Sequence, residues 1–130
     1  MSSIPLHRDR SPGLRVLFAN VIPFVFGAIC GVVLGESEGA YVVLSLVAAA
    51  GGFLAGFEHL GAREAAVRGG IAGLLFGAGI LLAHAVAGTD AKADLPDPEI
   101  VLAVITAVAG ALLAVPGGWL RGRRERATPA

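Results

Sequence analysis

The chain of 130 residues has little charge, since only 15% of its residues are Asp, Glu, Lys or Arg, against 55% that are hydrophobic. A soluble domain of this length needs more charged residues to cover its surface. The formal net charge is zero at pH 7, so no general electrostatic attraction to nucleic acid is expected. The composition therefore favours a membrane protein over a soluble helical bundle, and it predicts no nucleic-acid partner.

Cysteine is scarce as well, because Cys30 is the only one. It has no partner for a disulfide within the chain and no neighbouring ligands for a metal, so we interpret it as a packing residue of an apolar helix. The sequence contains no metal-ligand spacing, nucleophile triad or phosphate loop, and its Gly-rich stretches do not follow strands as a dinucleotide site requires. We therefore expect no enzyme, no cofactor and no metal.

Long apolar runs are what the chain has instead. Each is about as long as a helix needs to cross roughly 30 Å of hydrocarbon at about 1.5 Å per residue. The sequence thus predicts an all-α, polytopic membrane protein with one transmembrane domain, residues 14–120, between an N-terminal tail, residues 1–13, and a basic C-terminal tail, residues 121–130. The four predicted transmembrane helices are residues 14–34, 40–57, 69–87 and 100–120.

Basic residues fall on one side of this predicted topology. Nine of the ten Lys and Arg residues lie near the two ends of the chain or in the connection Gly61–Arg68, whereas the other two connections are acidic. An excess of basic residues marks cytoplasmic loops, so both termini and the Gly61–Arg68 loop are expected in the cytoplasm. We therefore predict a multi-pass protein of the cell membrane, and the preference for Arg over Lys is typical of a GC-rich prokaryotic source.

Glycines recur every four residues within three of the spans. This spacing places them on one helix face, where they form a smooth groove. Lipid-embedded helices associate by close backbone approach through such small residues. We predict that these glycines form packing faces, either within one chain or between chains of an oligomer. They are Gly27, Gly31, Gly35, Gly52, Gly56, Gly69, Gly73 and Gly77.

Two short matches hint at an internal repeat. "FGA" occurs at residues 26–28 and 76–78, and "AGGFLA" at residues 50–55 matches "AGALLA" at residues 109–114. The offsets of 50 and 59 residues are compatible with two duplicated helical hairpins in the same orientation. A chance match between Gly- and Ala-rich spans is the alternative.

Proline falls inside two of the spans, at Pro23 and Pro116. Prolines are tolerated in transmembrane helices when neighbours satisfy the freed carbonyl. We expect the stretch "VPGGW", residues 115–119, to bend or fray the last helix.

The most distinctive polar stretch connects the second and third spans. Glu64 and Arg68 have the spacing of a helical ion pair, and His59 faces Arg63 across the turn at Gly61 in our interpretation. One hypothesis makes this stretch a gate, proton relay or docking site; the hypothesis that we favour makes it a turn that sets topology and holds anionic lipid headgroups. The candidate residues are Glu58, His59, Arg63, Glu64 and Arg68.

His84 is the ionisable residue that lies within a predicted span. Such a residue is a functional candidate by default. Its position about one turn from the outer end favours a neutral imidazole that reaches the outer interface.

The pattern "GGFLAGF … GAREAAVRGGIAGLLFGAGILL … GALLAVPGGWLRGR" resembles small prokaryotic four-helix membrane protein families of unknown function. Those families combine a Gly-rich second helix, a short basic loop, a third helix of the type "GxxxGLLxG" and a late Gly-Gly ending. The likeness covers residues 51–80 and 110–123. It implies a topology, and no catalytic residue comes with it.

The sequence therefore favours a small non-enzymatic integral membrane protein that acts through glycine-mediated helix packing, as an oligomer or as an accessory subunit. Its expected partners are the lipid bilayer and a second copy or another membrane protein. The alternative is an oligomeric channel or small-solute transporter, with Glu36, Glu58 or His84 on a polar axis between protomers. No span carries a continuous polar stripe, which disfavours a water-filled pore within one chain.

Overall fold

The computed structural model describes residues 6–88, 90–91, 95 and 99–127, and these residues form helices and connecting turns with no strand among them. Four helical segments are long and apolar enough to cross a membrane. They are Pro12–Leu34, Glu38–Glu58, Ala62–Ala87 and Val101–Ala127. This confirms the predicted all-α fold and the four candidate transmembrane helices.

The first segment is a composite of three helices: α1 (Pro12–Val16), the π-helical η2 (Leu17–Val21) and α2 (Ile22–Leu34). Ser11 caps its start, because its hydroxyl accepts a hydrogen bond from the Leu14 amide at 3.4 Å. The π-helical turn ends two residues before Pro23, whose ring would clash with the carbonyl one turn earlier in a regular α-helix. A short 3₁₀ helix, η1 (His7–Asp9), precedes α1.

A short turn connects the next two helices. Helix α3 (Glu38–Ala55) begins at the N-cap Ser37, which accepts a hydrogen bond from the Ala40 amide at 3.2 Å, and it continues into the 3₁₀ turn η3 (Gly56–Glu58). Helix α4 (Ala62–Ala87) begins about two turns before residue 69, as the helix-forming residues after Gly61 predict. It ends at Gly88, whose φ of 68° is the left-handed conformation that glycine adopts readily.

Helix α5 (Val101–Ala127) is continuous. The prediction that it frays at residues 115–119 is wrong, because Pro116 lies inside the helix and the helical conformation extends past residue 120 into the basic tail. Two glycines of this stretch account for the difference. Gly117 and Gly118 lie directly against Phe57 and Gly61, so the turn between α3 and α4 packs onto α5 and supports it.

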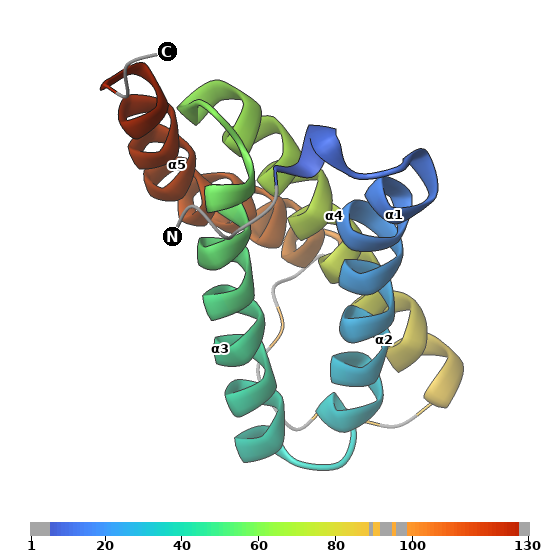
Figure 1. Ribbon diagram of the computed structural model, residues 1–130. Coiled ribbons are helices and arrows are strands. Elements are labelled where there is room, and N and C mark those ends of the chain that lie inside the picture. Colours follow the sequence, from blue (N-terminus) through green and yellow to red (C-terminus); the bar gives the residue numbers. More distant parts are fainter. Residues whose placement is uncertain (1–5, 89, 92–94, 96–98, 128–130) are drawn as a thin grey trace.

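Helix α4 occupies the middle of the bundle and packs against α2 on one side and α5 on the other (Figure 1). The C-terminal part of helix α3 contacts α5, where Gly56 lies against Ala114, and α3 makes few contacts with α4. Apolar side chains such as Val43, Leu46, Val86 and Leu112 point outward and are 59–80% exposed. An outer surface of this kind is typical of a protein that faces lipid.

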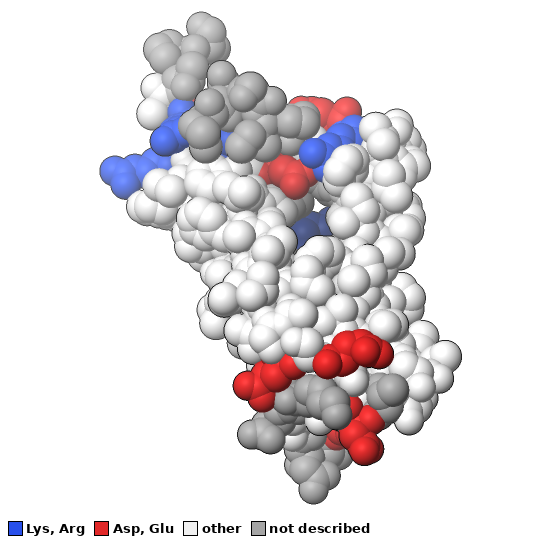
Figure 2. Space-filling view, turned by 90° about the horizontal axis from the view of Figure 1, so that it is seen from below, with Lys and Arg blue, Asp and Glu red and all other residues white. Residues whose placement is uncertain are grey.

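The charged residues lie at the two ends of the bundle. Figure 2 shows basic side chains gathered at one end and a band of uncharged side chains between the ends. The basic end holds η1, the turn between α3 and α4 and the end of α5; the charged residues described at the opposite end are acidic. The basic end is called the inner end below.

Candidate functional site

Glycines bring α2 and α4 into backbone contact. A Cβ atom on Gly27 would lie 2.8 Å from the carbonyl carbon of Phe76, and one on Gly31 would lie 2.9 Å from the Cβ of Ala83. Real Cβ atoms do not approach so closely, so only glycine fits. The phenyl rings of Phe26 and Phe76 stack beside this contact, with their centroids 6.1 Å apart.

A second glycine series joins α4 to α5. A Cβ atom on Gly69 would lie 2.9 Å from the carbonyl carbon of Gly110, and one on Gly73 would lie 2.8 Å from that of Thr106. Gly77 lies equally close to Ala103. The glycine groove of α2 is therefore filled by α4, and the glycine groove of α4 is filled by α5, both within the same chain.

The remaining predicted packing glycines differ in how closely they approach a neighbouring helix. Gly56 lies against the backbone of Ala114 in α5, whereas a Cβ atom on Gly52 would make only an ordinary contact, 3.9 Å from the Leu113 side chain. Gly35 is the buried C-cap residue of α2. Close contacts also involve Gly79 and Gly110, which the sequence analysis did not single out because they lie outside the four-residue series.

A cavity of about 650 Å³ lies between α2, α3, α4 and α5. Volumes of roughly 300–1,000 Å³ are typical of small-molecule sites. Its lining is mostly apolar and combines small residues such as Ala48 and Ala72 with large ones such as Phe26 and Leu113, with Tyr41 toward the acidic end. The cavity exists because α3 packs against α5 at one end only. Figure 2 shows the surface hollowed near the inner end, with basic atoms at the floor of the hollow.

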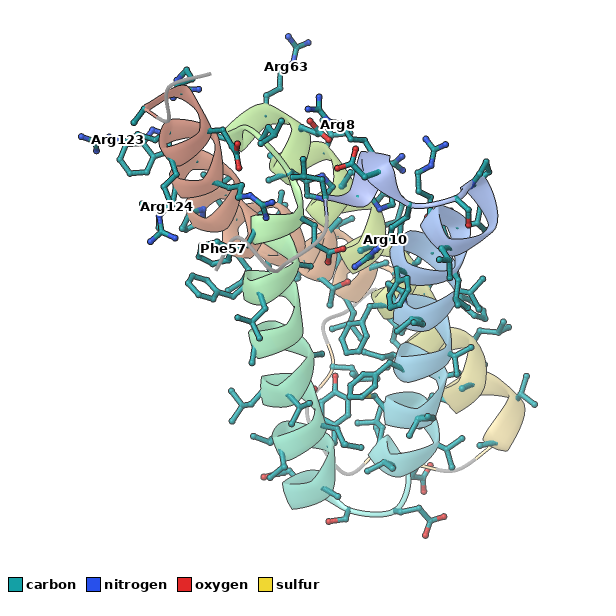
Figure 3. All side chains as sticks on the ribbon, viewed as in Figure 1. Arg8, Arg10, Phe57, Arg63, Arg123 and Arg124 are labelled. Carbon is teal, nitrogen blue, oxygen red and sulfur yellow. The ribbon has the colours of Figure 1, made fainter. Side chains whose placement is uncertain are left out.

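Charged and polar side chains gather where this cavity reaches the inner end. Arg10 extends from the N-terminal segment toward α3 (Figure 3) and forms an ion pair with Glu58 at 2.5 Å. The His59 ring lies 3.2 Å from the Glu64 carboxylate and 5.4 Å, between centroids, from the His7 ring. These contacts hold the segment before α1 across the inner end of the cavity.

The structure places the predicted polar candidates in different environments. His59 pairs with Glu64, so the prediction that it faces Arg63 is wrong; the shorter Glu64 side chain lies on the side of α4 that meets the turn. Arg63 is exposed and points away from the bundle (Figure 3). Glu58, His59 and Arg68 line the cavity.

His84 lies apart from this cluster, on α4 toward the acidic end. It is half-buried, and its Nδ1 atom is buried without a hydrogen-bond partner among the residues that the structure describes. It does not line the cavity described above, so the structure does not bring it together with the inner-end residues.

Arg121 is a polar residue that the sequence analysis assigned to the C-terminal tail. It is only 8% exposed, and its guanidinium donates a hydrogen bond of 2.7 Å to the carbonyl oxygen of Phe57. Its Nε also donates to Glu125 at 3.4 Å. Arg121 thus satisfies the backbone at the end of η3 and ties α5 to the turn between α3 and α4.

His7 lines the cavity at its inner end and is only 5% exposed. Its pKa lies below the ordinary value, first because burial disfavours the charged imidazolium and then because Arg68, His59, Arg10 and Arg15 lie nearby. Its Nε2 atom is buried without a hydrogen-bond partner among the described residues. His7 is therefore held neutral, with one ring nitrogen available to a ligand.

This lowered pKa predicts that acid weakens the packing of the segment before α1 across the inner end of the cavity. The unfolded chain binds more protons than the folded chain near the ordinary histidine pKa of about 6.5, so the stabilisation by buried His7 is present above that pH and is lost as the pH falls below it. We expect thermal stability in detergent to decrease between about pH 7.5 and about pH 5. The His7→Phe variant, which keeps a ring but cannot titrate, should show a smaller decrease; an equal decrease would contradict this role.

Comparison with protein-family models, curated proteins and solved structures finds no match to this chain. Its function is therefore inferred from the fold, the glycine contacts and the cavity. Within the described ranges, no group of three or more His, Cys, Asp or Glu side chains is arranged to hold a metal ion.

Proposed function

We propose that this chain is a small, non-enzymatic integral membrane protein that receives a mostly apolar small molecule between its helices. The observation that supports this proposal is the cavity of about 650 Å³, which has apolar walls and a polar inner end. Glycine contacts fix α2, α4 and α5 as a rigid frame. Helix α3 packs closely against α5 only at its C-terminal end, and the space for a ligand lies beside the rest of the helix.

A small-solute transporter is the second candidate, favoured by the ion pair between Arg10 and Glu58. The pair closes the inner end of the cavity and would act as a gate if the N-terminal segment moved. The cavity lies within one chain, so this version of the proposal replaces the axis between protomers that the sequence suggested. Glu36 lies at the acidic end, between α2 and α3, and does not line the cavity, so it has no role in this transporter proposal.

We propose that the chain spans the cell membrane of a prokaryote and that its inner end faces the cytoplasm. Support comes from the excess of Arg at this end. Reporter fusions after Ala130 and within residues 89–94, a stretch that includes residues outside the described ranges, should report opposite sides of the membrane, with Ala130 inside. The same side for both fusions would contradict the topology.

The cavity proposal is tested by native mass spectrometry of the chain in mild detergent. We expect one retained small molecule per chain. Ala48→Phe, which fills the cavity from α3, should abolish retention, whereas Ala50→Phe, on an exposed face of the same helix, should not. A bare chain, or equal retention by both variants, would contradict the proposal. A mass of two chains, or of the chain with another membrane protein, would instead support the predicted role as an oligomer or accessory subunit.

A further inference from the structure

We infer that the cavity holds one acyl chain of an anionic phospholipid from the inner leaflet, with the phosphate bound by Arg68 and His7. This inference rests on the proposed function and specifies its ligand. The charge at the inner end of the cavity, the length of its apolar part and the position of both in the membrane support such a ligand.

Arg68 supplies a positive charge that no protein group neutralises within the part of the chain that the structure describes. It is half-buried, lines the cavity and makes no hydrogen bond or ion pair there. The nearby acid Glu58 is already paired with Arg10. A guanidinium in a partly apolar site gains most from an oxyanion that accepts two of its N–H groups, as a phosphate does.

His7 provides a second, independent contact for the same anion. It lines the same end of the cavity, is nine-tenths buried and has the unpartnered Nε2 atom described above. A buried polar nitrogen without a partner is costly. In the tautomer that carries hydrogen on Nε2, it donates to a phosphate oxygen placed between His7 and Arg68.

The apolar part of the cavity has the length of one leaflet. Its lining on α4 extends from Arg68 to Ile80, twelve residues that rise roughly 18 Å at about 1.5 Å per residue. Half of a bilayer's hydrocarbon core is about 15 Å thick. An inner-leaflet lipid whose phosphate lies at Arg68 would therefore place its acyl chain along this wall. A soluble anion has no apolar part that could contact the apolar walls of the cavity, so we favour a lipid.

The test compares two lipids that carry the same phosphate but differ in net headgroup charge, because the quaternary ammonium of phosphatidylcholine offsets the phosphate charge. The purified full-length chain in a zwitterionic detergent is titrated with phosphatidylglycerol or with phosphatidylcholine of identical acyl chains, and bound lipid is counted by native mass spectrometry. We expect one phosphatidylglycerol per chain, bound on the order of tenfold more tightly than phosphatidylcholine, because Arg68 beside the shared phosphate repels the choline cation.

The variants use two arginines of the same helix. Arg68→Gln should remove the preference for phosphatidylglycerol, and Arg68→Lys should retain part of it. Arg63→Gln makes the same charge change at an exposed position outside the cavity and should leave the preference intact. If Arg68→Gln does not fold, the wild-type chain and Arg68→Lys still test the inference. Both retain the charge, but only arginine can bind the phosphate with two N–H groups, so the preference for phosphatidylglycerol should be weaker in Arg68→Lys.

Several outcomes would overturn the inference. Equal binding of the two lipids, equal losses in Arg63→Gln and Arg68→Gln, or retention of a free fatty acid in place of a phospholipid would each do so. If Ala48→Phe abolishes binding while Arg68→Gln leaves the lipid preference unchanged, the cavity proposal stands and only the anionic ligand is wrong. If Ala48→Phe binds lipid normally, the proposed function itself fails.

Discussion

Gly73→Ala is expected to lower the free energy of unfolding by about 1–3 kcal/mol, the range observed for overpacked interiors. The added methyl group would lie 2.8 Å from the Thr106 carbonyl carbon and 3.1 Å from the Ala107 Cα, both of which are backbone atoms of α5. Backbone cannot rotate away as a side chain can, so α4 and α5 must separate. Reversible unfolding in a mild detergent titrated with a denaturing one would measure the change.

Gly51→Ala is the matched control for this prediction. Gly51 also lies inside a helix, but a Cβ atom there would meet no other atom within 4 Å. Alanine has the higher helix propensity by up to about 1 kcal/mol, so we expect unchanged or slightly increased stability. If both variants lose stability equally, close packing at Gly73 is not the cause.

Arg121→Leu is expected to lower the free energy of unfolding by about 1–3 kcal/mol, because the Phe57 carbonyl oxygen would stay buried without its hydrogen-bond donor. The effect should be local at first: amide hydrogen exchange should accelerate in η3 and in the following turn, which Arg121 holds against α5. Stability measurements and hydrogen exchange on the same variant would test both parts.

Arg123→Leu serves as the control for charge. Arg123 is exposed, points outward (Figure 3) and lies 5.3 Å above the Trp119 ring. Such an exposed cation–π contact contributes about 0.5–1 kcal/mol. A loss in Arg121→Leu that does not exceed that in Arg123→Leu would show that the buried hydrogen bond is unimportant.

The helices were predictable because each depends on a contiguous run of residues. An apolar run of about 20 residues, a cap such as Ser37 and a terminating glycine such as Gly88 act locally. The four-residue spacing of glycines likewise identified Gly27 and Gly73 as residues of a packing face. What it left open was the partner of each face, since the backbone of Phe76 or Thr106 comes close only once the helices are arranged in space.

The site was less predictable for the same reason. Arg121 belongs to an Arg-rich stretch whose sequence predicts a solvated tail. It is buried because Gly117 and Gly118 let the turn between α3 and α4 approach α5. The cavity follows from the position of α3 relative to three other helices. No local pattern encodes such a position. His7, the seventh residue of the sequence, likewise gave no signal that it lines a cavity.

The central claim is that the glycine faces join helices of one chain, and cysteine cross-linking tests it most directly. Phe26→Cys and Phe76→Cys, in a Cys30→Ala background, replace the two rings that stack across the α2–α4 contact. A short thiol cross-linker should join them within a single chain carrying both substitutions and should give no product between two differently tagged chains carrying one substitution each. A cross-linked dimer of the two single variants, with no internal product in the double variant, would show that the glycine faces join separate chains and would contradict the account.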